Sequence, residues 1–322
     1  MPNSIFANAR AAALSGGLLG AERLNRMIDC ASPEDALKIL REVGFGAESA
    51  ADGSETETLI EAEETAFAAF VRETSPAEKL TRFLLARWDY RNAEAVMRSK
   101  YLKTDYRTMA GTEGVYPLAL LQEKIFSDDY AVFGKHLGTA LTEADALFVG
   151  GTATGKKISV LFSRAQFAEL VSLAGRDKLL REIVAFRADA ANIGISLRAR
   201  DARLASEMTV PGGTLSEEDF RVLAQESAET VRDRFRRSPR RDLIYDALED
   251  AEKGRPLIAL EKASESCALA VFSREKYNDE GYRLFFRYCC EKLTELGNVR
   301  LVMSCLASGV DKATIRARVR SV

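Results

Sequence analysis

The feature that most constrains the fold is an internal repeat. When residues 80–102 are shifted by 100 positions they fall on residues 180–202, and five positions are identical. These pairs are Leu80 with Leu180, Arg87 with Arg187, Asp89 with Asp189, Asn92 with Asn192 and Arg98 with Arg198. A shift of 206 gives a weaker third copy, in which Glu295 and Asn298 match Asp89 and Asn92. Self-similarity of this kind indicates a chain built from copies of one unit.

Apolar residues in these segments recur at helical spacing. Leu80, Leu84, Trp88 and Val96 fall on one i+4 line, and similar faces begin near residues 179 and 285. This is the pattern of helices that pack one face into a core, and no convincing series of alternating strands accompanies it. We therefore predict an all-α fold of three similar helical domains, at residues 1–110, 111–212 and 213–322. A unit near 100 residues is long enough to hold its own small core.

Each copy carries an acidic residue followed three positions later by asparagine. We call these the acid–Asn pairs: Asp89 with Asn92, Asp189 with Asn192, and Glu295 with Asn298. Asn92 lies on the apolar line, where an amide without hydrogen bonds would cost about 1–3 kcal/mol. Asp89 is one turn earlier and faces the same way. We predict that each pair ties a neighbouring helix or loop within its unit, and that no pair is catalytic.

The composition excludes several kinds of catalytic site. His136 is the only histidine, so paired-histidine metal sites are excluded, and a Ser-His-Asp triad would have to use this residue. His136 lies between glycines, which favours a turn or a helix end. The five cysteines form no CxxC pair, which is typical of buried thiols in a reduced compartment. We predict no catalytic residue, metal or cofactor. No apolar run approaches the roughly 18 residues needed to span a bilayer.

One segment offers an alternative. Residues 150–157 (Gly-Gly-Thr-Ala-Thr-Gly-Lys-Lys) nearly match the phosphate-binding loop GxxxxGK[ST]. Lys157 stands where that loop needs a serine or threonine for magnesium, and no second strand ending in a metal-binding aspartate is evident. The competing interpretation is an ordinary loop before a helix at residues 160–173.

Two blocks of charge suggest exposed faces. The net charge of −2 gives no whole-chain attraction to nucleic acid. Seven acids without a basic residue lie between positions 48 and 64: Glu48, Asp52, Glu55, Glu57, Glu61, Glu63 and Glu64. Six arginines lie between positions 232 and 241: Arg232, Arg234, Arg236, Arg237, Arg240 and Arg241. Either block is a solvated face or a docking surface for a charged partner. The arginine block contains a single aromatic residue, which disfavours a base-stacking surface for nucleic acid.

The repeated helix resembles a known signature. Residues 84–100 (Leu-Leu-Ala-Arg-Trp-Asp-Tyr-Arg-Asn-Ala-Glu-Ala-Val-Met-Arg-Ser-Lys) look like the signature helix of the C/d-subunit family of V-type (archaeal/vacuolar-type) ATPases. Residues 186–192 are similar to its second copy and residues 295–320 to its last. The resemblance covers nearly the whole chain, and the ordered triple occurrence is its specific part. Departures are Ala188 and Ala190 at positions of larger residues, and Glu295 in place of aspartate.

The resemblance implies an all-helical, funnel-shaped protein whose three domains surround a pseudo-threefold axis. Such subunits perform no chemistry. They lie on the cytoplasmic face of the membrane, as peripheral parts of the complex, between the central stalk and the proteolipid ring, and they pass torque to the ring for proton or sodium transport. The alternatives are a nucleotide-binding enzyme that uses residues 150–157, and an unrelated helical scaffold.

Overall fold

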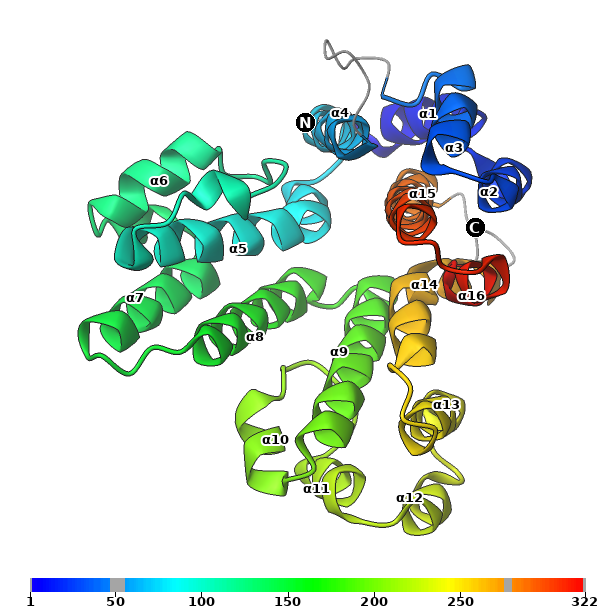
Figure 1. The fold of residues 1–322 in the computed structure, drawn as a ribbon. Helices are drawn as coiled ribbons and strands as arrows, with labels where there is room; N and C mark the ends of the chain where they lie inside the picture. Colours follow the sequence, from blue (N-terminus) through cyan, green and yellow to red (C-terminus); the bar gives the residue numbers. More distant parts are fainter. Residues whose placement is uncertain (1, 47–55, 275–279, 321–322) are drawn as a thin grey trace. The chain divides into compact units, whose positions relative to one another are not determined.

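The computed structural model describes residues 2–46, 56–274 and 280–320 of this chain (Figure 1). Within those ranges the regular structure is entirely helical, with α-helices, two short 3-10 helices and no strand. The prediction of an all-α fold is therefore confirmed. The chain divides into two compact units, of which unit 1 comprises residues 1–84 and 265–322 and unit 2 comprises residues 85–264.

The division falls inside two long helices, α5 (Glu78–Leu102) and α14 (Ile258–Arg274), so each contributes to both units. The other helices of unit 1 come from the two ends of the chain. They are α1 (Ser4–Ser15), α2 (Gly20–Asp29), α3 (Pro33–Glu42), α4 (Thr56–Thr74), α15 (Arg283–Ala307) and α16 (Lys312–Arg318).

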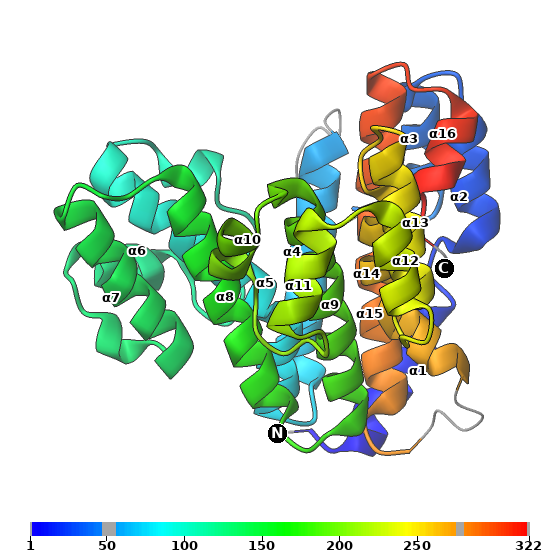
Figure 2. The same ribbon diagram turned by 90° about the horizontal axis from the view of Figure 1, so that it is seen from below.

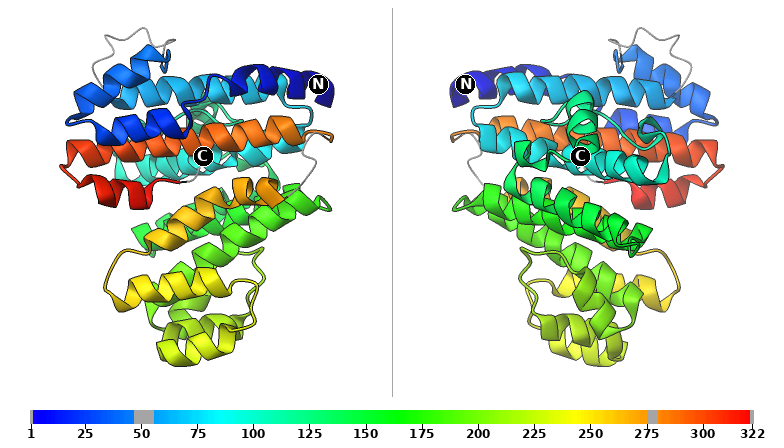
Figure 3. Two further views of the ribbon diagram at one scale, coloured as in Figure 1. Left: turned by 90° about the vertical axis from the view of Figure 1, so that its right-hand side faces the viewer. Right: turned by 90° about the vertical axis from the view of Figure 1, so that its left-hand side faces the viewer.

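Unit 1 is built around α15. This helix packs against α1, α2, α3, α4 and α16, and Figure 3 shows α1 running beside it. Its buried side chains include Phe285, Phe286 and Val302, and Val302 shares a core cluster with Met27 and Leu40. Because apolar residues occupy most sides of α15, burial on most sides is its favourable state. Segments from opposite ends of the sequence thus form one core.

Unit 2 contains the middle of the chain. Its further helices are α6 (Leu118–Phe126), α7 (Lys135–Val149), α8 (Gly155–Ala174), α9 (Lys178–Ala199), α10 (Ala202–Met208), α11 (Glu217–Gln225), α12 (Ala228–Phe235) and α13 (Arg241–Glu252). The 3-10 helices are η1 (Tyr106–Thr108) and η2 (Tyr130–Val132). The central helix is α9, which packs against α8, α10, α11 and α13 (Figure 2). Its Ile193 shares a core cluster with Phe235 and Ile244.

Side-chain caps fix where several of these helices begin. Ser216 accepts a hydrogen bond from the Asp219 amide, and the Asp219 carboxylate accepts one from the Ser216 amide. This reciprocal box fixes the start of α11. Asp177 caps α9 by accepting hydrogen bonds from the amides of Leu179 and Leu180. The chain therefore marks its helix boundaries with local hydrogen bonds, and packing adds to them.

The three domains expected at residues 1–110, 111–212 and 213–322 stay a prediction, as does their arrangement about a pseudo-threefold axis. No helix in the described parts of the chain has a stretch both long and apolar enough to cross a bilayer.

Candidate functional site

The first acid–Asn pair lies on α5 and binds the loop that follows this helix. Asn92 donates from Nδ2 to the carbonyl of Thr112 over 3.0 Å and accepts from the Gly111 amide over 2.9 Å. Asp89 accepts from the Tyr116 amide through Oδ1 over 2.9 Å. Both side chains are buried. The pair therefore fixes the path of the chain between α5 and α6.

The second pair, on α9, repeats this arrangement. Asn192 exchanges two hydrogen bonds with the backbone of Val210, of 2.9 and 2.8 Å. Asp189 accepts from the Thr214 amide over 2.6 Å through Oδ1, and from its hydroxyl over 2.7 Å through Oδ2. Asp189 also forms an ion pair of 2.8 Å with Arg240. Since Asp189 is fully buried, these donors replace the hydration that its charge would lose.

A glycine makes each of these two arrangements possible. A Cβ atom at Gly114 would collide with the Asp89 carboxylate, and one at Gly213 would collide with the Asp189 carboxylate. The loop backbone can approach each acid closely because both positions lack a side chain. The close approach of Gly213 to Asp189 becomes visible in the structure alone.

The third pair, on α15, differs from the first two in the partner of its acid. Asn298 exchanges two hydrogen bonds with the backbone of Arg320, of 3.0 and 2.9 Å. Glu295 accepts from the Leu19 amide over 2.5 Å, so its partner lies near the amino-terminal end of the chain. It also lies 2.7 Å from Lys292, which is equally close to Glu63.

One lysine compensates part of the negative charge of this third site. Burial of Lys292 acts to lower its pKa, but the charges of Glu295 and Glu63, and their hydrogen bonds, outweigh it and raise the pKa. Lys292 therefore stays protonated and compensates one unit of the negative charge that Glu295 and Glu63 carry. The acids of the three acid–Asn pairs, Asp89, Asp189 and Glu295, are each no more than 4% exposed. The contacts that the structure gives these acids are hydrogen bonds and ion pairs within the chain, and their role as structural ties stays a prediction.

The arginine block divides into paired and unpaired members. Arg232 pairs with Glu252, Arg234 with Asp219, Arg240 with Asp189 and Arg241 with Asp242. Arg240 is mostly buried and forms part of the second acid–Asn site, a role that its position in a run of arginines does not indicate. Arg236 and Arg237 are exposed and form no ion pair with the described residues. A docking role for the block stays a prediction.

The acidic block turns partly inward. Arg300 of α15 binds Glu57 and Glu64, at 2.8 and 3.0 Å. Glu63 pairs with Lys292, as described above. Glu48, Asp52 and Glu55 lie outside the described residues. These contacts make part of the block a helix–helix interface within unit 1.

The glycine-rich segment is a turn between two helices. The apolar run at residues 146–149 that precedes it forms the last turn of α7, whereas a phosphate-binding loop follows a strand. The amides of Thr152 and Ala153 both donate to the Leu147 carbonyl, and the Lys157 amide donates to the Thr154 hydroxyl. Most amides that would cradle phosphate are therefore occupied. The helix expected at residues 160–173 is α8, which begins earlier, at Gly155.

His136 is the second residue of α7, in agreement with the expected helix end. Its Nε2 lies 2.9 Å from the hydroxyl of Ser172, a residue of α8 that is distant in sequence. This is the one hydrogen bond of the ring within the described chain, so no carboxylate orients it as a catalytic triad requires. The described residues also contain no cluster of three His, Cys, Asp or Glu side chains that could hold a metal ion.

Comparison with known protein families identifies the family of this chain. The sequence model of the ATP synthase (C/AC39) subunit family matches residues 7–318. The chain belongs to this family. The resemblance carried by the three repeated helices is thereby confirmed.

A curated relative supports the C/AC39 assignment. The chain is 25% identical to the C subunit of the A-type ATP synthase of Thermococcus onnurineus (strain NA1), over 97% of this chain and 88% of the relative. The similarity extends along both chains, so it covers all three acid–Asn pairs.

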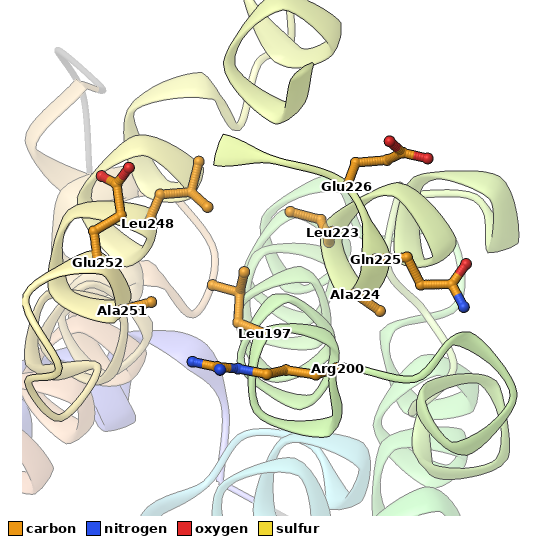
Figure 4. A pocket seen from close by; sticks show the side chains of 9 residues that line it. All are labelled: Leu197, Arg200, Leu223, Ala224, Gln225, Glu226, Leu248, Ala251 and Glu252. Carbon is orange, nitrogen blue, oxygen red and sulfur yellow. The ribbon is translucent and has the colours of Figure 1, made fainter. Parts of the chain in front are cut away.

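The C/AC39 chain also has a hollow at one end of the α9, α11 and α13 bundle. It has a volume of about 550 Å³ and an apolar floor that includes Leu197, Leu223 and Leu248 (Figure 4). Of the two carboxylates at its edge, Glu252 pairs with Arg232 and Glu226 lies 3.5 Å from Arg221. No histidine, cysteine, serine or threonine lines it. The hollow therefore combines these leucines with polar side chains at its edge and contains no nucleophilic side chain.

Proposed function

We propose that this chain is a non-catalytic central-rotor subunit of a V-type or A-type ATPase. It would lie on the cytoplasmic face of the membrane, link the central stalk to the proteolipid ring, and transmit torque for ATP-driven proton or sodium transport. The observation that carries the proposal is the family match over residues 7–318, which comprises all three repeated helices.

The buried acid–Asn pairs suit such a role. A part that transmits torque must resist shear between its helices and the loops that join them. Each pair joins one long helix to another segment through several hydrogen bonds, and two of the acids also hold buried basic side chains, Arg240 and Lys292. Charge-assisted hydrogen bonds shielded from water are stronger than exposed ones, so these ties favour a stiff helical frame.

Isolation of the native assembly tests the proposal. The chain should be purified from native membranes under mild detergent and the accompanying proteins identified. Central-stalk subunits and the proteolipid ring are expected, and removal of the chain should abolish ATP-driven ion uptake by the vesicles while the detached catalytic head keeps its ATPase activity. Absence of both partners would overturn the proposal. Magnesium-dependent ATP binding by the isolated chain would instead favour the enzyme alternative at residues 150–157.

A further inference from the structure

Unit 2 has a groove that is separate from the acid–Asn sites. It lies between α7, α8 and α10 and has a volume of about 860 Å³. Its lining residues on α7 include Ala140, Glu143 and Leu147, and those on α8 include Leu161 and Ala168. These positions follow helical spacing, so one face of each helix borders the groove. From His136 to Leu147 the α7 wall spans about 16 Å at 1.5 Å per residue, or about three turns.

The floor of the groove is apolar and within reach of solvent. Leu147, Val160 and Leu161 line it together with Leu204 and Met208 of α10, and each of these side chains is only half-buried. These side chains form an apolar strip between α7, α8 and α10 that a partner's apolar side chains could cover. Its length suits an amphipathic helix laid between two supporting helices, in the manner of other helix-in-groove complexes.

The rim of the groove carries excess positive charge. Its basic residues are Lys135, Lys156, Lys157 and Arg164. Within the described chain none of the four forms an ion pair, since Lys157 donates to the Thr152 carbonyl and Arg164 to the Glu207 carbonyl. The acidic members of the rim are Glu143 and Glu207, and Glu207 already pairs with Arg203. The groove therefore favours a partner with apolar and acidic side chains.

We propose that this groove binds an acidic amphipathic helix of another subunit. The helix would bury an apolar stripe about three turns long against the Leu147 and Leu161 floor, with carboxylates beside the lysines at the rim. That the partner is a subunit of the same assembly rests on the proposed function. The groove's preference for an acidic amphipathic helix is independent of the proposed function, because it follows from the lining residues alone.

Peptide binding by the isolated full-length chain tests the preference. Two fluorescent helical peptides share one leucine stripe and differ only in carrying glutamate or lysine on the flanks. The acidic peptide should bind at least about tenfold more tightly than the basic one. Lys156→Glu should weaken binding of the acidic peptide by about threefold to tenfold, as expected for a partly exposed ion pair, whereas the control Lys253→Glu, directly after α13, should leave binding unchanged. No binding, equal binding of both peptides, or an equal effect of both variants would overturn the proposal.

Cross-linking in the native assembly identifies the occupant. A photoreactive benzoylphenylalanine in place of Leu161 should form an adduct with an acidic, amphipathic helical segment of another subunit, whereas one in place of the exposed Ala146 should not. An adduct with a basic segment or with a second copy of this chain, or no adduct in an intact assembly, would overturn the assigned partner. If the rotary subunits fail to co-purify while the acidic peptide still binds selectively, the proposed function fails and the groove preference stands.

Discussion

The first two acid–Asn pairs and the third use the same residue pattern to close different loops. Asp89 and Asp189 bind backbone amides of the chain that follows them, at Tyr116 and Thr214. Glu295 binds the amide of Leu19, which precedes α2. At the third site the amino-terminal segment therefore replaces the downstream loop as the partner of the acid, whereas Asn298 still binds a downstream residue, Arg320. The repeat retains a way of fixing a loop to a helix, whichever part of the chain supplies that loop.

The second and third acid–Asn sites also differ in how basic side chains compensate the charge of the acid. Asp189 holds one basic partner, Arg240, on the loop side of its helix. Glu295 shares Lys292 with a second carboxylate, Glu63 of α4. Loss of Asp189 therefore removes the ion-pair partner of Arg240, whereas loss of Glu295 leaves Lys292 with Glu63. We expect the effects of substitution to follow that order.

The largest effect is expected for Asp189→Ala. The variant leaves Arg240 without its carboxylate and the Thr214 amide without its acceptor, and breaking a buried ion pair costs about 3–5 kcal/mol of unfolding free energy. Trp88 is the only tryptophan and lies buried in unit 2, so its fluorescence during urea unfolding reports on this unit. The control Asp189→Asn retains one acceptor oxygen and should lose less. A cost below about 1 kcal/mol for the alanine variant would contradict the structural role of this site.

A smaller effect is expected for Glu295→Ala. The Leu19 amide loses its acceptor while Lys292 keeps Glu63, so the cost should be about 2–3 kcal/mol. Hydrogen exchange of the Leu19 amide measures the local part of this change and should become faster. Glu295→Asp tests whether the longer side chain of glutamate is needed to reach the Leu19 amide. If aspartate protected this amide from exchange equally well, side-chain length would not explain why the third pair has glutamate where the other two have aspartate.

The pH dependence of unit 1 sharpens the comparison further. A lysine with a raised pKa contributes stability that is fully present below its unfolded pKa of about 10.4 and is lost as pH rises through the folded value. In Glu295→Gln, Lys292 keeps only one carboxylate, so this alkaline loss should shift to lower pH. The slope attributable to one proton is at most about 1.4 kcal/mol per pH unit. Urea unfolding between pH 8 and pH 12, followed by hydrogen exchange in α15, measures it. If the unfolding free energy depended on pH identically in wild type and variant, Glu295 would not contribute to the raised pKa of Lys292.

The sequence predicted those features that depend on neighbours within a few turns. Helical periodicity predicted the all-α fold, and the glycines on either side of His136 predicted a turn or helix end there, where α7 begins. The spacing of Asp89 and Asn92 placed both on one buried helix face, because residues three apart on a helix are neighbours. Each of these inferences needs only local geometry.

Contacts between distant segments were beyond local patterns. Leu19 and Glu295 are separated by 276 positions, and Glu63 and Lys292 are almost as far apart in the sequence. Arg240 looks like its neighbours in an arginine run until the fold brings Asp189 beside it. A side chain's charge shows that a partner is needed without showing which residue supplies it.

The smallest effect on folding is expected at the exposed end of the arginine block. Arg237→Ser removes no ion pair with the described residues, and such surface changes usually alter the unfolding free energy by no more than about 0.5 kcal/mol. Arg240→Ser, three positions along the same run, exposes the uncompensated charge of Asp189 and should destabilise unit 2 strongly. The two variants remove the same charge, so a comparison of their Trp88-monitored unfolding separates a surface arginine from a structural one.

The same pair of variants tests the docking role predicted for the block. If Arg237 contributes to docking, Arg237→Ser should weaken retention of the chain on the native membrane assembly with little change in unfolding, and the difference from wild type should shrink as salt rises. A loss of retention for Arg240→Ser alone, in proportion to its loss of stability, would instead assign the block to the folding of the second acid–Asn site. The run of six arginines would then owe its effect on assembly to Asp189 rather than to a charged partner.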